Sequence, residues 1–205
     1  MVEKFSPPPN FPLAAALFEA SLAVVAVALG WLLARPPLET LHGNFSALGT
    51  GALATLPLVA LLILCAWLPL RPFSDILEVV DDMLEPLFHD CSLVEMAVIS
   101  VLAGVGEELL FRAVVQASLA DWITHPVTGW RLSAPVAGWL AALLVAVLFG
   151  LMHAVNFSYA LLAGLIGFYL GWLWMATGDI AVPITAHALY DFLAMLYVVK
   201  IRKQP

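Results

Sequence analysis

Two adjacent carboxylates and a guanidinium interrupt a long apolar run in the stretch GEELLFR, residues 106–112. A charge at mid-membrane costs roughly 2.5 to 3.5 kcal/mol on insertion scales, so each charged group there needs a partner or a function. Glu108 and Arg112 are four residues apart with the acid first, which favours an ion pair on one helix face. Glu107 points about 100° away around the helix and has no cation at i+3 or i+4. It is therefore either a free acid–base group or a member of one structural salt-bridge cluster.

Two further motifs carry imidazoles on later apolar runs. FGLMH places Phe149 and His153 four residues apart on one helix face, and HALYD does the same for His187 and Asp191. A single histidine on an apolar helix is more often a hydrogen-bonded core residue than a catalytic one. Two such histidines and a spare glutamate on three separate runs can meet only in the interior of a helical bundle.

Three chemistries fit this set of side chains. Glu107 and His153 could hold and deprotonate a water that attacks an amide carbonyl. His187 and Asp191 would then donate or organise hydrogen bonds to the oxyanion. One glutamate and two histidines also match the ligand count of a catalytic zinc site with an open position, although the compact His-Glu-x-x-His motif is absent. The same residues could instead relay protons in a transporter.

The rest of the chain must hold these residues in a membrane. Its 205 residues are 63% hydrophobic and 11% charged, with a mean hydropathy of +1.00, which lies outside the range of soluble domains. A spanning helix needs about 20 apolar residues. Runs of this kind predict six spans, at residues 11–34, 47–70, 92–120, 135–155, 159–177 and 180–199. The predicted fold class is an all-α polytopic membrane bundle, with a single transmembrane domain over residues 1–205 and the motifs within residues 92–199.

Acidic residues outside the motifs are expected to have structural roles. The segment from Ser74 to Asp90 is rich in carboxylates and has apolar residues at helical spacing. It is predicted to be a short amphipathic helix at the membrane surface, with a connecting role favoured over substrate gating. Glu19 and Glu95 are lone acids near span ends, and a structural or interfacial role is expected for both.

The charged residues also bear on which partners the protein binds and on its orientation in the membrane. The net charge of −7 and the lack of a basic stripe argue against nucleic acid. Six spans put both termini on one side of the membrane, and the positive-inside rule predicts that this side is the cytoplasm. The basic residues on that side are Lys4, Arg71, Lys200, Arg202 and Lys203, against Arg35 and Arg131 on the other.

The three motifs resemble those of the CAAX protease and bacteriocin-processing (CPBP) family of intramembrane endopeptidases, which includes the eukaryotic CAAX prenyl endopeptidase. The stretch 107–112 is similar to the EExxxR motif, 149–153 to FxxxH, and 187–191 to HxxxN/D, in the same order. The resemblance covers about residues 93–199. It implies a membrane-embedded helical protease that depends on a glutamate.

The resemblance also implies residue roles. Glu107 and His153 would activate the water, and His187 and Asp191 would form the oxyanion site. Asp191 stands where many members carry Asn, and an ionised Asp cannot donate a hydrogen bond, so it would have to be protonated or orient His187. The supporting residues would be Glu108, Arg112 and Phe149.

Cofactor, partner and location follow from the same resemblance. A metal-free glutamic mechanism is favoured over a zinc-dependent one, for which the ligands would be Glu107, His153 and His187. The implied partner is a membrane-anchored protein or peptide substrate in the lipid bilayer, and the expected location is the bacterial inner membrane. The alternative functions are a catalytically inactive binding or immunity protein of the same fold and a proton-coupled transporter.

Helix lengths predict similar depths for two of the three motifs. At a rise of about 1.5 Å per residue, His187 lies about 12 Å below the outer surface, where its helix starts. Glu107 lies about 22 Å from Ser92 at the inner end of its helix, which is compatible with the depth of His187. His153 would lie about 30 Å along a helix that starts at Ser133, close to the inner surface. We therefore expect that this helix begins above the bilayer, that it tilts strongly, or that the bilayer thins around the site.

Overall fold

The computed structural model describes residues 7–8, 10–129 and 132–202, and this part of the chain contains helices and no strand. Lys4, Arg131 and Lys203, on which the predicted orientation partly depends, lie outside the described residues. The long helices are α1 (Phe11–Leu32), α2 (Phe45–Trp67), α5 (Leu93–Glu108), α7 (Ala134–Met152), α8 (Phe157–Thr177) and α9 (Ala181–Leu196). The shorter elements are α3 (Arg71–Val79), η1 (Val80–Leu84), α4 (Glu85–Phe88), η2 (Leu109–Gln116), α6 (Ala117–Thr124), η3 (Pro126–Thr128) and η4 (Tyr197–Ile201).

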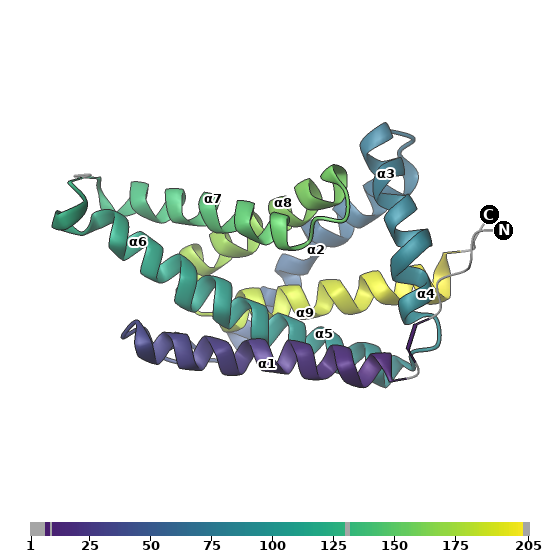
Figure 1. The fold of residues 1–205 in the computed structure, drawn as a ribbon, viewed down its shortest axis with the longest axis horizontal. Helices are drawn as coiled ribbons and strands as arrows, with labels where there is room; N and C mark the ends of the chain where they lie inside the picture. The colour runs from purple at the N-terminus through teal and green to yellow at the C-terminus, as the bar shows by residue number, and fades with distance from the viewer. Residues whose placement is uncertain (1–6, 9, 130–131, 203–205) are drawn as a thin grey trace.

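Five helical stretches of the described chain are long and apolar enough to cross a membrane, namely α1, α2, α7, α8 and α9 with η4. The third predicted span forms a continuous helix from α5 through the π-helical stretch η2 into α6 (Figure 1). Its junction residues Leu109 and Ala117 keep right-handed helical dihedrals. The chain is therefore an integral membrane protein built as a polytopic helical bundle, as the hydropathy predicts.

Side-chain caps fix where several helices begin. At the start of α5, the Ser92 hydroxyl accepts a hydrogen bond from the Glu95 backbone N–H at 3.2 Å, and the Glu95 carboxylate accepts one from the Ser92 N–H at 2.8 Å. This capping box explains the lone acid Glu95 as a structural residue. At the start of α8, the Asn156 side-chain oxygen accepts a single hydrogen bond from the Tyr159 backbone N–H at 2.8 Å, and Gly178 ends α8 with a positive φ of 67°.

The bundle is organised around α5 and α9. Helix α1 packs on α5, α5 on α9 and α9 on α2, while α7 and α8 form a pair that contacts this row through α6, η2 and α9. Helices α5 and α9 approach closely at Gly104, where a Cβ atom would lie 2.9 Å from the Ile184 carbonyl oxygen and 3.0 Å from the Ala188 Cβ. The first and third motifs are therefore carried by two helices in direct backbone contact.

The acidic segment before α5 is docked onto the bundle. Residues 71–88 form α3, η1 and α4 in succession, and their buried side chains include Ile76 and Val80. Two polar ties hold this segment in place. Ser158 Oγ donates to Asp75 at 2.9 Å, and Arg202 binds Asp81 through both guanidinium nitrogens at 2.6 and 3.0 Å. The predicted segment is helical, and its apolar residues Ile76 and Val80 are buried against the bundle.

The depth of His153 depends on where α7 lies relative to the other helices. The end of α6 and the start of α7 lie further along the long axis of the molecule than the start of α9 (Figure 1). Of the three expectations for this helix, a start beyond its neighbours agrees best with that arrangement. Helix α7 ends at Met152, which makes His153 its C-terminal cap, and α8 begins at Phe157 after a short turn.

A substitution at Gly104 tests the close approach of α5 and α9. Gly104→Ala should lower the free energy of unfolding by about 1 to 3 kcal/mol because the added methyl forces the two helices apart. Thermal unfolding in detergent micelles measures this change. Gly49→Ala on α2 is the matched control, since no atom lies within 4 Å of the Cβ it adds. Equal stability of the two variants would contradict the described packing.

Candidate active site

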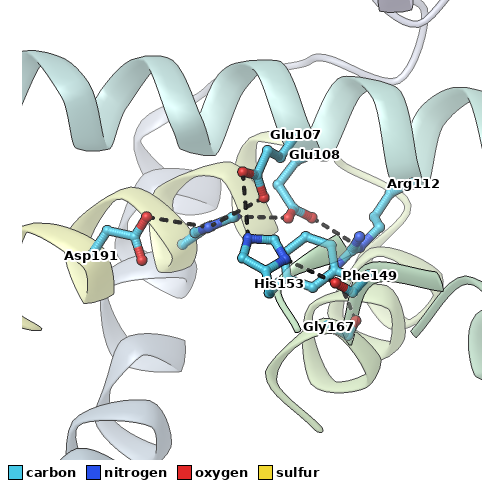
Figure 2. Close-up of polar contacts among 8 residues, drawn as sticks. Glu107, Glu108, Arg112, Phe149, His153, Gly167 and Asp191 are labelled. Carbon is cyan, nitrogen blue, oxygen red and sulfur yellow. Dashed lines mark hydrogen bonds and ion pairs between the residues drawn. The ribbon is translucent and has the colours of Figure 1, made fainter. Parts of the chain in front are cut away.

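Helix α5 ends in the two adjacent glutamates, and both are removed from the surface. The residue exposure is 7% for Glu107 and 0% for Glu108. Figure 2 shows the Glu107 and Glu108 carboxylates on the same helix, both pointing toward the side of the His153 ring, with Asp191 on α9 to the left. Because consecutive helical residues point in different directions, the two acids have different partners.

Glu108 forms a buried network that joins three helices. Its Oε2 lies 3.1 Å from Arg112 Nε, and both side chains are fully buried. Its Oε1 lies 2.9 Å from His187 Nδ1 on α9, and Arg112 Nη2 donates to the Gly167 carbonyl on α8 at 3.0 Å. An ionised carboxylate only accepts hydrogen bonds, so His187 carries a proton on Nδ1 and directs Nε2 toward the site.

Phe149 supports this network from α7. Its ring lies 4.9 Å from the Arg112 guanidinium carbon, in cation–π geometry, and stacks on the His153 ring at a centroid distance of 4.5 Å. Gly167 leaves room for the ring, because a Cβ at that position would lie 3.1 Å from it. The spacing of FGLMH thus puts the aromatic ring between the buried guanidinium and the imidazole.

Glu107 faces both imidazoles without a direct hydrogen bond. Its Oε1 lies 3.9 Å from His153 Nε2, and its Oε2 lies 4.0 Å from His187 Nε2. His153 Nδ1 lies 2.8 Å from the Phe149 carbonyl oxygen, to which it donates, so Nε2 is the nitrogen directed at Glu107. Polar groups separated by more than about 3.5 Å are commonly joined through a water molecule. This geometry suits a water held between a carboxylate and an imidazole.

Asp191 completes the group from one turn further along α9. Its Oδ2 lies 3.4 Å from His187 Nε2. His187 therefore presents one ring nitrogen to Glu108 and the other to the space shared by Glu107 and Asp191. The structure brings together all the side chains that the sequence predicts for the site, including the supporting residues Glu108, Arg112 and Phe149.

These side chains open onto a cavity of about 380 Å³. Glu107, His153, His187 and Asp191 line it, and most of its remaining wall is apolar. The wall also includes Glu19 of α1 and residues of α2, α3, η1 and α4, so the docked acidic segment forms part of the cavity wall. The polar side chains of the site thus share one cavity with a largely apolar lining.

The residues do not fit a zinc site as they are placed. Zinc binds histidine nitrogens at about 2.0 to 2.1 Å in a compact shell of ligands. Among the described residues, no group of three or more His, Cys, Asp or Glu side chains is arranged to hold a metal ion. Glu107, His153 and His187 stand around a wider space, and we derive no reaction step through a metal.

Two polar residues near the site were not predicted. Gln116 is 1% exposed, and its Nε2 donates to the Gly171 carbonyl at 3.3 Å, one turn beyond the Arg112–Gly167 contact. Its position four residues after Arg112 in an apolar run is the signal that could have found it. Glu19, for which a structural or interfacial role is expected, also lines the cavity.

Comparison with known proteins gives one match to a family. The model of the family described as type II CAAX prenyl endopeptidase Rce1-like matches residues 90–193, just over half of the chain. No curated protein and no solved structure matches. The matched region contains all three motifs and excludes α1, α2, α3 and α4.

The buried pair can be tested by removing its cation. Arg112→Leu should lower the free energy of unfolding by about 3 to 5 kcal/mol, because it leaves the Glu108 carboxylate buried and uncompensated. Denaturant unfolding in micelles measures the loss. Arg35→Leu is the control, since Arg35 pairs with Asp121 at an exposed position and should cost less than about 1 kcal/mol. Similar losses for both variants would show that the Glu108–Arg112 pair does not anchor the site.

Proposed function

The chain belongs to the Rce1-like family of type II CAAX prenyl endopeptidases, and on that premise we propose that it hydrolyses a peptide bond with a water activated by Glu107 and His153. One observation carries this proposal. Glu107 is a nearly buried carboxylate without an ion-pair partner at hydrogen-bond distance, and it lines a cavity about 4 Å from the Nε2 atoms of His153 and His187.

The reaction begins with the water. Glu107 takes one proton from the water while His153 holds the water in place. The resulting hydroxide attacks the carbonyl carbon of the scissile peptide. The tetrahedral intermediate then collapses as Glu107 returns the proton to the leaving nitrogen. The C–N bond breaks, and the products are a carboxylic acid and an amine, so no covalent enzyme intermediate is required.

His187, supported by Asp191, stabilises the oxyanion of that intermediate. His187 is oriented by its Nδ1 contact with Glu108 at 2.9 Å, which directs Nε2 toward the reacting carbonyl oxygen. For this role Nε2 must carry a proton as well as Nδ1, which makes His187 an imidazolium, and the Asp191 carboxylate, 3.4 Å from Nε2, stabilises that positive charge. Asp191 acts through His187 in this mechanism, which accommodates an Asp where an Asn would donate directly.

The substrate class follows from the family and from the cavity. We propose a membrane-associated protein or peptide whose cleaved segment enters the apolar cavity from the side of α3 and α4. The start of α1 and the end of η4 both contact this side, through the Phe11–Phe88 ring pair and the Arg202–Asp81 ion pair. We assign this side to the cytoplasm on the positive-inside rule.

Replacing the proposed base tests the proposal in living cells. Glu107→Gln should abolish cleavage, with a rate loss of roughly 10²- to 10⁴-fold or more, because the amide cannot take the proton from water. Mass spectrometry of membrane proteins should find a shortened protein only in cells that carry the intact enzyme. Glu95→Gln on the same helix is the control. Identical protein profiles for the intact and Glu107→Gln cells, with both proteins folded, would instead support an inactive binding protein.

A chelator separates the metal-free mechanism from a zinc-dependent one. We propose that the reaction needs no metal, since Glu107, His153 and His187 are not arranged as a set of zinc ligands. Purified enzyme treated with a strong chelator should therefore cleave its substrate at an unchanged rate. The measurement is the rate before and after dialysis, together with the zinc content of the sample. A loss of activity that added zinc restores would overturn this part of the proposal.

A further inference from the structure

Glu19 lies in the candidate site although it belongs to a helix outside the matched region. Its side chain lines the same cavity as Glu107, His187 and Asp191. Helix α1 is held against α5 at this level, because a Cβ on Gly106 would lie only 2.5 Å from the Glu19 carbonyl oxygen. The position of Glu19 relative to the catalytic carboxylate is thus fixed by direct backbone contact.

One oxygen of this carboxylate lacks a hydrogen-bond donor in the part of the chain that the structure describes. Glu19 Oε2 is buried and has no hydrogen-bond partner among the described residues. Its charged neighbours are His187 and Asp191 on α9 and Glu107 on α5, and the two acids repel it. Glu95 differs, because its carboxylate accepts two hydrogen bonds from Ser92 at 2.8 and 2.7 Å. A buried acceptor without a partner is costly to folding and indicates a ligand that supplies the donor.

A bound substrate would supply such a donor. The substrate segment around the scissile peptide bond must be extended to be attacked. Its backbone N–H groups therefore lose their helical hydrogen-bond partners inside an apolar cavity. The described residues form no strand whose edge could pair with them, and the helix backbones that line the cavity bond internally. Side chains of the cavity wall are therefore suited to supply acceptors for the substrate backbone.

We propose that Glu19 accepts a hydrogen bond from a backbone N–H of the bound substrate next to the scissile bond. This inference rests on the proposed function and adds a binding residue to it. The hydrogen bond is charge-assisted and is present in both the bound substrate and the transition state. It therefore contributes to substrate affinity and leaves the chemical step unchanged.

The test uses a synthetic peptide that covers the cleavage site found by the Glu107 comparison. Glu19→Leu should raise KM roughly 10- to 100-fold with little change in kcat, because it removes a hydrogen bond to a charged acceptor. Glu19→Gln keeps an acceptor oxygen and should show a smaller rise. Glu19→Leu should not lower the melting temperature, since the carboxylate has no partner in the folded protein. A structural role would lower it.

Methylation of the peptide identifies the donor. Peptides that carry one N-methyl amide at successive positions around the scissile bond are assayed with the intact protein and with Glu19→Leu. At one position, the N-methyl group should raise KM for the intact protein and have little further effect on Glu19→Leu. An unchanged KM for Glu19→Leu, or additive effects at every position, would overturn this inference and leave the proposed function intact. The absence of any Glu107-dependent product would overturn both.

Discussion

The buried ion pair between Glu108 and Arg112 is the interaction on which the site depends. Two charges removed from solvent need every available hydrogen bond, and two of these come from other helices, at His187 on α9 and the Gly167 carbonyl on α8. The pair thereby fixes the register of three helices. Arg112 also neutralises Glu108, so the adjacent Glu107 has no cationic partner on its own helix.

Small residues allow the helices that carry this network to pack closely. Helices α5 and α9 touch at Gly104, and α1 touches α5 at Gly106, so the side chains that follow on each helix are brought within a few ångströms of one another. Gly167 similarly admits the Phe149 ring under Arg112. Without a hydrophobic driving force between helices in lipid, such packing and interhelical hydrogen bonds are what hold a bundle together.

The parts of the site that the sequence predicts are those set by local spacing. Residues four apart on a helix share a face, which correctly paired Glu108 with Arg112, Phe149 with His153 and His187 with Asp191. The depth of His153 was not predictable, because it depends on how far α7 extends beyond its neighbours. Contacts such as Asp81 with Arg202 link residues far apart in the chain, and a lone acid such as Glu19 carries no signal of which face it occupies. The catalytic roles themselves remain predictions.

The cavity is assembled from two unlike portions of the chain. The groups that we propose to react lie on α5, at the end of α7 and on α9, within the matched region, while α1, α2, α3 and α4 contribute part of the wall and lie before it. On the proposed function, residues outside the matched region would therefore touch the substrate. Changes in the first ninety residues would then alter the shape of the cavity while the side chains around Glu107 stay in place.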